Sequence, residues 1–358
     1  MLNWLLIIVP VVIALEYLAP ERQLLVFVAA ALAILPLAGW MGRATEQLAE
    51  RSGEGVGGLL NATFGNAAEL IIALAALRAG LHDVVKASIA GSIVGNILLV
   101  LGAAMVAGGL RHPEQHFDAS GARSQATLLT LAAIALILPA AYNVTAGGTP
   151  PGGLGFLSVS ISVVLLAVYV LFLVYSLVTH KDLFSGSLAR EHDANQAASW
   201  STARAITVLA GATALVAWIS EVLVGAIELT AHEFGLSKVF MGVFIVAILG
   251  NAAEHATAVT AALKNRMDLS LSIAIGSSVQ VALFVAPVLV LASLVIGPAP
   301  MDLAFSGGLV LTVLLSVLIT GQVAGDGRSD WLKGVQLLAV YVILGLAFFF
   351  VTPERPTP

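Results

Sequence analysis

Apolar residues fill most of this chain in long runs that short polar segments interrupt. A helix needs about twenty apolar residues to cross the hydrocarbon of a bilayer, and only helices or closed barrels satisfy the backbone there. The pattern predicts an all-α polytopic membrane protein with about eleven transmembrane helices. Their expected ranges are Leu2–Leu18, Leu24–Trp40, Gly57–Leu77, Val84–Gly108, Ala126–Tyr142, Phe156–Val178, Ala205–Glu228, Phe240–Leu263, Leu269–Ile296, Ala304–Val323 and Trp331–Val351.

Composition supports the membrane assignment, because 59% of residues are hydrophobic, 10% are charged and the mean hydropathy is +0.99. The net charge of −5 gives no basic patch, so no nucleic-acid partner is expected and the lipid bilayer is the expected environment. The chain has no cysteine, which excludes disulfides, thiolate metal sites and cysteine catalysis. No nucleophile or metal-water site of an intramembrane hydrolase is found, so the protein is not expected to be an enzyme or to need a cofactor.

One sequence, Gly-Asn-Ala-Ala-Glu, occurs twice, at residues 65–69 and again 185 residues later at 250–254. The similarity continues at the same offset after the motif, through Asp83 and Asp268, Gly91 and Gly276, and Leu98 and Leu283, which indicates an internal duplication. Each half has five expected spans, and because five is odd the second half enters the membrane from the opposite side. The sequence therefore predicts two inverted five-helix repeats and one extra N-terminal helix. The expected divisions are the extra helix at residues 1–20, the first repeat at 21–179, a linker at 180–200 and the second repeat at 201–358.

Loop charges predict the orientation, because Lys and Arg collect in cytoplasmic loops. A cytoplasmic N-terminus places eleven Lys and Arg residues inside and five outside. The linker would then be cytoplasmic and the C-terminus external, in a protein of the cell (inner) membrane.

The repeated motif places an acid, Glu69 or Glu254, inside an apolar span, where ionisable residues are costly and usually functional. Asn66 and Asn251 lie three residues before these acids, so each amide shares a helical face with its carboxylate. The carbonyls around two glycines, at 65 and 250, would add ligands if those helices were locally unwound. Hard oxygen ligands of this kind suit Ca²⁺, which takes six to eight of them.

A second polar layer follows each motif. Ser92 and Asn96 lie on one helical face, and Ser277 and Gln280 on another, where they would orient the carboxylates, carry protons or simply bond neighbouring helices. His255 directly follows the second acid and would couple protons or make a structural hydrogen bond. One further acid per repeat, Glu46 and Glu228, would line an entrance or be an ordinary solvated charge.

The motifs resemble those of a known family. GNAAEHATAVTAALKNRMD from Gly250 and GSSVQVALF from Gly276 resemble the second signature of the cation/proton exchanger (CAX) branch of the Ca²⁺/cation antiporter superfamily. GLLNATFGNAAE from Gly58 and GSIVGN from Gly91 resemble the first signature. The resemblance implies a secondary transporter that exchanges Ca²⁺, or another divalent cation, for H⁺ by alternating access, with Glu69 and Glu254 binding the ion and the protons.

Two other functions remain open on the sequence. A Na⁺-coupled Ca²⁺ exchanger is the nearest alternative, although related Na⁺-coupled antiporters use a different motif around the acid. A divalent-cation channel of the same fold would conduct without a counter-ion. The oligomeric state is not predicted.

Overall fold

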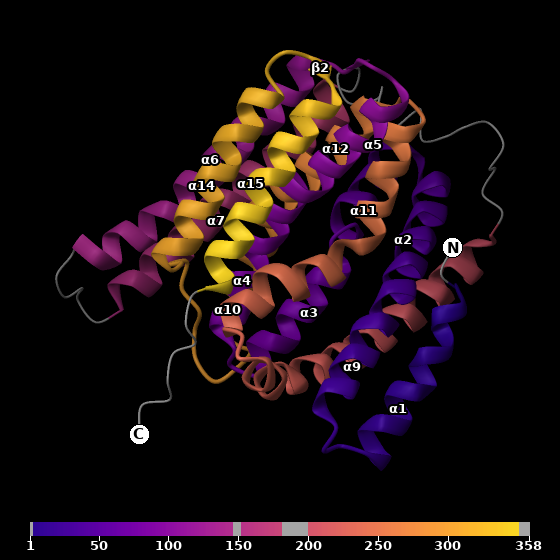
Figure 1. Ribbon diagram of the computed structural model, residues 1–358, viewed down its shortest axis with the longest axis vertical. Coiled ribbons are helices and arrows are strands. Elements are labelled where there is room, and N and C mark those ends of the chain that lie inside the picture. The colour runs from indigo at the N-terminus through magenta and orange to yellow at the C-terminus, as the bar shows by residue number, and fades with distance from the viewer. Residues whose placement is uncertain (1–2, 146–151, 181–199, 351–358) are drawn as a thin grey trace. The chain divides into compact units, whose positions relative to one another are not determined.

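The computed structural model describes residues 3–145, 152–180 and 200–350 (Figure 1). The expected linker at 180–200 lies almost entirely outside the described residues, and so does the chain from residue 351 onward. Nearly all described residues are helical.

The chain folds into two compact units, and each unit takes segments from both halves of the sequence. Unit 1 contains Met1–Ser88, Ala198–Ala253 and Gly345–Pro358, and unit 2 contains Ile89–Ala197 and Glu254–Leu344. Three helices, α4, α11 and α15, contribute residues to both units: α4 is His82–Val94, α11 is Ala247–Leu263 and α15 is Trp331–Phe349.

Unit 1 is built on the packing of two long helices, α2 (Gln23–Phe64) and α9 (Thr202–Phe234). Alanines on α2 let the helices approach closely, and Ile34 and Met41 of α2 are fully buried, as are Ile219 and Leu223 of α9. The remaining elements of the unit are η1 (Asn3–Ile7), α1 (Ile8–Leu18), α3 (Ala67–Arg78), α10 (Lys238–Phe240) and the π-helix η4 (Met241–Val246).

Within its 42 residues α2 is sharply bent. A straight helix would separate Ala49 and Gly57 by about 12 Å, since each residue rises 1.5 Å. Instead, a Cβ atom placed on Gly57 would lie 2.5 Å from the carbonyl oxygen of Ala49. Glycine at this position permits the close backbone approach. The expected boundary between the second and third spans is therefore a bend within a continuous helical stretch.

Unit 2 has a central, deeply buried rod made of the end of α4 from Ile89 onward, the π-helix η2 (Gly95–Val100) and α5 (Leu101–Arg111). Ile93, Ile97, Leu101 and Met105 recur at intervals of four residues and are fully buried along one side of this rod. Around it are α6 (Ala119–Thr145), α7 (Gly153–Val174), η3 (Tyr175–Thr179), α12 (Met267–Gln280), η5 (Val281–Val285), α13 (Ala286–Ala292) and α14 (Gly307–Val323). Helices α6 and α14 run side by side (Figure 1).

The expectation of an all-α fold needs one small correction. Two two-residue strands, β1 (Gln115–His116) and β2 (Arg328–Ser329), pair antiparallel in the loops before α6 and α15. They form because the two loops run extended side by side. The hydrophobic pattern of the sequence does not encode this arrangement.

Among the described residues, eight helical stretches are long and apolar enough to span a membrane, and two shorter apolar helices cover Trp4–Leu18 and Gly307–Val323. The multi-pass character expected from the sequence is confirmed. The expected third span, Gly57–Leu77, is not one helix, because the end of α2 and the start of α3 meet at a turn at Gly65 and Asn66. The count of eleven spans stays a prediction.

Candidate ion-binding site

The first motif lies at the break between α2 and α3 in unit 1. Asn66 has a non-helical backbone, with φ −99° and ψ 23°, and α3 starts at the next residue. Glu69 consequently falls in the first turn of α3, where the unpaired N–H groups and the positive end of the helix dipole favour a carboxylate. Asn66 and Glu69 are both buried, with 2% and 9% of their surfaces exposed.

The second motif has a different backbone. Gly250 to Glu254 lie inside the continuous helix α11, so the local unwinding considered at Gly250 does not occur. The irregularity lies one turn earlier, in the π-helix η4 that ends at Val246. Asn251 is 1% exposed, and its Nδ2 donates a hydrogen bond to the carbonyl oxygen of Ala247 at 2.9 Å. The break that opens the first motif is thus absent from the second.

Glu69 packs directly on the backbone of the second motif within unit 1. A Cβ atom added to Gly250 would lie 2.7 Å from Cγ of Glu69 and 3.5 Å from its Cδ. The glycine of one motif therefore makes the space that the acid of the other motif fills.

Glu254 belongs to a connected polar network in unit 2. Its side chain is hydrogen-bonded to Ser277 of α12. Asn96 donates from Nδ2 to the Ser277 hydroxyl at 3.1 Å, and Nε2 of His255 lies 3.2 Å from Oδ1 of Asn96. One carboxylate oxygen, Oε2 of Glu254, is buried and has no hydrogen-bond partner among the described residues.

The polar layer expected from the sequence is thus partly brought together. Asn96, Ser277 and His255 join Glu254. Ser92 is buried in α4, and Gln280 is half-buried at the end of α12. Asn96 lies in η2, and Gln280 directly precedes η5. A π-bulge frequently marks a functional site, because it redirects side chains and frees backbone groups.

Sequence reasoning missed two hydroxyl groups that support these bulges. Ser278 donates to the carbonyl oxygen of Ile93 at 3.3 Å, and Thr320 donates to that of Ile97 at 3.5 Å. Both hydroxyls are fully buried. In the sequence they stand out only as polar residues within apolar spans. Many Ser and Thr residues in membrane helices occur in the same way and serve only helix packing.

The two acids considered as entrance residues are both exposed. Glu228 pairs with Lys238, and about half of each side chain is accessible. The entrance role stays a prediction beside the alternative of a solvated charge.

A buried acid beside a helix break and a second acid in a polar network, both within apolar helices, are typical of multi-pass membrane proteins that transport ions. Residues 22–178 and 204–350 match the model of the sodium/calcium exchanger protein family. The chain belongs to this family, and within it to the cation/proton exchanger branch.

Three relatives illustrate the similarity. The chain is 47% identical over 345 residues to the Ca²⁺/H⁺ antiporter of Aphanothece halophytica, with 92% of this chain and 91% of that protein covered. It is 44% identical over 319 residues to the Ca²⁺/H⁺ antiporter ChaA of Bacillus subtilis, with 89% and 90% covered. It is 40% identical over 341 residues to vacuolar cation/proton exchanger 1a of Oryza sativa subsp. japonica, with 91% and 75% covered.

Solved structures agree on the fold. The structure of native YfkE superimposes with a TM-score of 0.82 at 39% sequence identity, covering 97% of this chain and 99% of that one. The crystal structure of the H⁺/Ca²⁺ exchanger CAX superimposes with a TM-score of 0.70 over 97% of this chain and 90% of that one. Its 15% identity shows the fold alone.

Proposed function

We propose that this protein is a secondary transporter that exchanges Ca²⁺ for H⁺, with Glu69 and Glu254 as the ion- and proton-binding carboxylates. The observation that carries the proposal is the pair of acids, each inside an apolar span and each in a copy of the same motif. An ionisable residue at such a position is costly unless it has a function. The relatives named Ca²⁺/H⁺ antiporters match nearly the whole chain and support this transported pair.

The packing of Glu69 on Gly250 within unit 1 supports a joint role of the two motifs, because the acid of the first motif lies against the glycine of the second. The ligand set would comprise the two carboxylates, the amide oxygens of Asn66 and Asn251, and backbone carbonyls near Gly65, where the helix is broken. These are hard oxygen ligands, which Ca²⁺ accepts in irregular geometry.

Exchange would follow from competition for the same oxygens. Ca²⁺ requires ionised carboxylates, so the binding of protons and of Ca²⁺ is mutually exclusive. In an alternating-access cycle the protein would face one side with Ca²⁺ bound and return with protons bound. Ser277 and Asn96 would keep the Glu254 carboxylate oriented in both forms, since they connect it to His255 through hydrogen bonds.

The proposal includes the membrane orientation expected from the loop charges, with the N-terminus and the linker cytoplasmic, the C-terminus external and the cell (inner) membrane as the site of action. The two inverted repeats are proposed with it. The separate matches of the family model to residues 22–178 and 204–350 support a repeat.

Uptake of radioactive Ca²⁺ by proteoliposomes tests the function directly. We expect uptake when a pH gradient is imposed and none when only a Na⁺ gradient is imposed. Uptake driven by Na⁺ alone would instead support a Na⁺-coupled exchanger, the second candidate, since the matching family is the sodium/calcium exchanger protein family. Ca²⁺ flux without either gradient would indicate a channel.

A further inference from the structure

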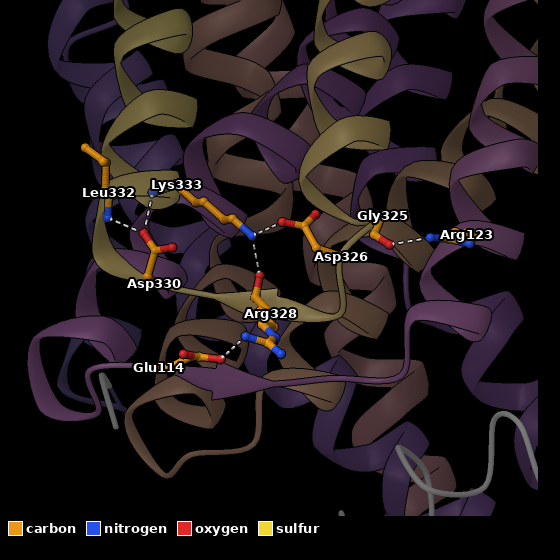
Figure 2. Close-up of polar contacts among 8 residues, drawn as sticks. All are labelled: Glu114, Arg123, Gly325, Asp326, Arg328, Asp330, Leu332 and Lys333. Carbon is orange, nitrogen blue, oxygen red and sulfur yellow. Dashed lines mark hydrogen bonds and ion pairs between the residues drawn. The ribbon is translucent and has the colours of Figure 1, made fainter.

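A short segment before α6, His112–Asp118, crosses one end of unit 2, and we call it the strap. Its strand β1 pairs with β2 in the loop before α15, in the register Gln115 with Ser329 and His116 with Arg328. Phe117 adds a backbone hydrogen bond to the carbonyl oxygen of Gly327 at 3.0 Å. Figure 2 shows the ion pair between Glu114 and Arg328, 3.4 Å long, that joins the same two loops.

The loop on the other side of this ribbon is itself fixed. Nζ of Lys333 donates to Oδ2 of Asp326 at 2.5 Å and to the carbonyl oxygen of Arg328 at 2.7 Å (Figure 2). Arg123 at the start of α6 donates to the carbonyl oxygen of Gly325 at 2.7 Å. The strap is therefore attached to a loop that side-chain hydrogen bonds hold in place.

From this loop the strap reaches the turn between α11 and α12. Gln115 is 1% exposed, and its Nε2 donates to the carbonyl oxygen of Ala262 at 2.9 Å and to Oδ1 of Asn265 at 3.0 Å. Asn265 has a left-handed backbone, with φ 58°, where the chain turns out of α11. The backbone N–H of Asp118 donates to Oδ1 of Asp268, in the first turn of α12, at 2.6 Å.

The space for the Gln115 amide depends on a glycine in α5. A Cβ atom on Gly108 would lie 2.0 Å from Oε1 of Gln115 and 3.1 Å from the carbonyl oxygen of Ala262. Any side chain at position 108 would displace the amide from its two acceptors.

The helical hairpin held in this way carries the polar network of the second motif. Glu254 precedes Ala262 by eight residues in α11, or about 12 Å along the helix axis, and Ser277 follows Asp268 by nine residues in α12. A helix moves along its axis as a unit. The hydrogen bonds of the strap to the α11–α12 turn therefore fix how far α11 and α12 are shifted along their axes, and so fix the positions of Glu254 and Ser277 relative to each other.

We propose that Gln115 is a positioning residue for ion binding: it fixes the α11–α12 hairpin to the strap, and thereby holds the carboxylate of Glu254 in register with Ser277 and Asn96. Gln115 does not touch the ion. The inference rests on the proposed function, since it assigns Glu254 a part in binding Ca²⁺.

The first test replaces Gln115 by methionine, which has a similar length and no donor. Gln115→Met should raise the Ca²⁺ concentration for half-maximal exchange about tenfold, the effect of losing a buried hydrogen-bonded pair. The matched control is His116→Ala, the next residue of the strap, whose side chain is exposed and which should leave the value unchanged. Ca²⁺ binding to the purified variants, measured by calorimetry, should show the same ratio.

The Ca²⁺ concentration for half-maximal exchange distinguishes a positioning role of Gln115 from a merely structural one. A variant that only folds less well would lower the maximal rate and leave the half-saturating Ca²⁺ concentration at the wild-type value, and that result would overturn the proposal. Asn265→Gly provides an independent route, because glycine keeps the left-handed backbone and removes one acceptor. Its effect should not add to that of Gln115→Met, whereas full additivity would contradict a shared action.

A disulfide tests whether the attachment is permanent. The chain has no native cysteine, and His116 and Arg328 face each other across β1 and β2, so His116→Cys with Arg328→Cys allows a single specific cross-link. The oxidised protein should exchange at the rate of the reduced protein. Inhibition that a reductant reverses would show that the strap must detach, and would overturn the proposal of a fixed attachment.

Failure of the proposed function would look different from failure of this inference. In that case wild-type protein would not exchange Ca²⁺ for protons, or Glu254→Gln would remain active. If wild type exchanges, Glu254→Gln is inactive and Gln115→Met binds Ca²⁺ normally, only the role of Gln115 is wrong.

Discussion

Cγ of Glu69 lies only 2.7 Å from the position that a Cβ atom on Gly250 would occupy, which is too close for a side chain there. Glu69 opens α3 and Gly250 lies within α11, and they are separated by 181 residues of sequence. Two copies of one motif are thus in contact through the acid of one and the glycine of the other.

This contact predicts that Gly250→Ala impairs Ca²⁺ binding although every proposed ligand remains. The added methyl group would push Glu69 from its position, and forced packing of this kind typically costs about 1–3 kcal/mol. We expect Ca²⁺ affinity to fall by about five- to a hundredfold, measured by calorimetry on purified protein. The control is Gly211→Ala in α9, where an added Cβ would meet no atom within 4 Å apart from its own helix backbone, and normal binding by Gly250→Ala would contradict the prediction.

Substitution of either acid by its amide should abolish exchange. Glu69→Gln and Glu254→Gln keep the shape of the side chain but remove a ligand charge and a titratable proton. The measurement is proton-driven Ca²⁺ uptake into proteoliposomes, with folding checked by gel filtration in detergent. Glu221→Gln, at an exposed acid paired with Arg78, serves as the control and should transport normally. A single variant of Glu69 or Glu254 with the wild-type rate would show that the two-carboxylate site is wrong.

The affinity for Ca²⁺ should rise with pH if protons and Ca²⁺ compete at these two carboxylates. Each proton that must leave makes the apparent affinity roughly tenfold stronger per pH unit, and the affinity levels off once both acids are ionised. Ca²⁺ titrations of purified protein between about pH 5 and pH 9 would show this rise, and the Gln variants should show weaker binding with a smaller slope. An affinity independent of pH over that range would exclude the competition.

The Asp326–Lys333 pair makes a separate prediction about stability. The hydrogen bond from Lys333, supported by its charge, lowers the pKa of the Asp326 carboxyl below its usual value of 3.8. A carboxyl whose pKa is lower in the folded state stabilises the protein fully above its unfolded pKa, and this stabilisation is lost as the pH falls through the lowered value. The effect should be small, because the Asp326 side chain is 53% exposed and solvent screens the pair.

We therefore expect Asp326→Asn to lower the unfolding temperature slightly at pH 7, and the difference from wild type to shrink as the pH falls below 3.8. Thermal unfolding of purified protein at several pH values measures it. In the Lys333→Met background the same substitution should have a smaller effect at pH 7. A difference that grows as the pH falls would have the wrong sign for this pair.

The loop charges predict that the linker is cytoplasmic. A cysteine introduced at Ser187 should react with a membrane-impermeant thiol reagent only when the cytoplasmic face is accessible, and the absence of native cysteine removes background labelling. Glu233→Cys, at the end of α9 before Lys238, is the complementary probe and should react from outside. Labelling of the cysteine at 187 from outside in intact cells would reverse the orientation.

The sequence alone determined the membrane environment, most of the spans and the two motifs. Lipid accepts few polar groups, so apolar runs about twenty residues long and the rare acids within them are visible without coordinates. The helical stretches Ala119–Thr145, Gly153–Thr179 and Met267–Ala292 lie close to expected spans for this reason. The same chemistry made Glu69 and Glu254 stand out, while their roles remain proposals.

Only the tertiary structure decided how the motifs differ and what holds them. Identical sequences form a helix break at Gly65 and Asn66 but a continuous helix at Gly250, because the surrounding packing, and not the five shared residues, sets the backbone. The side chain of Gln115 binds atoms about 150 residues away, at Ala262 and Asn265. A hydrogen bond between distant segments leaves no periodic pattern in the chain, so no reading of hydrophobic and polar positions would reveal it.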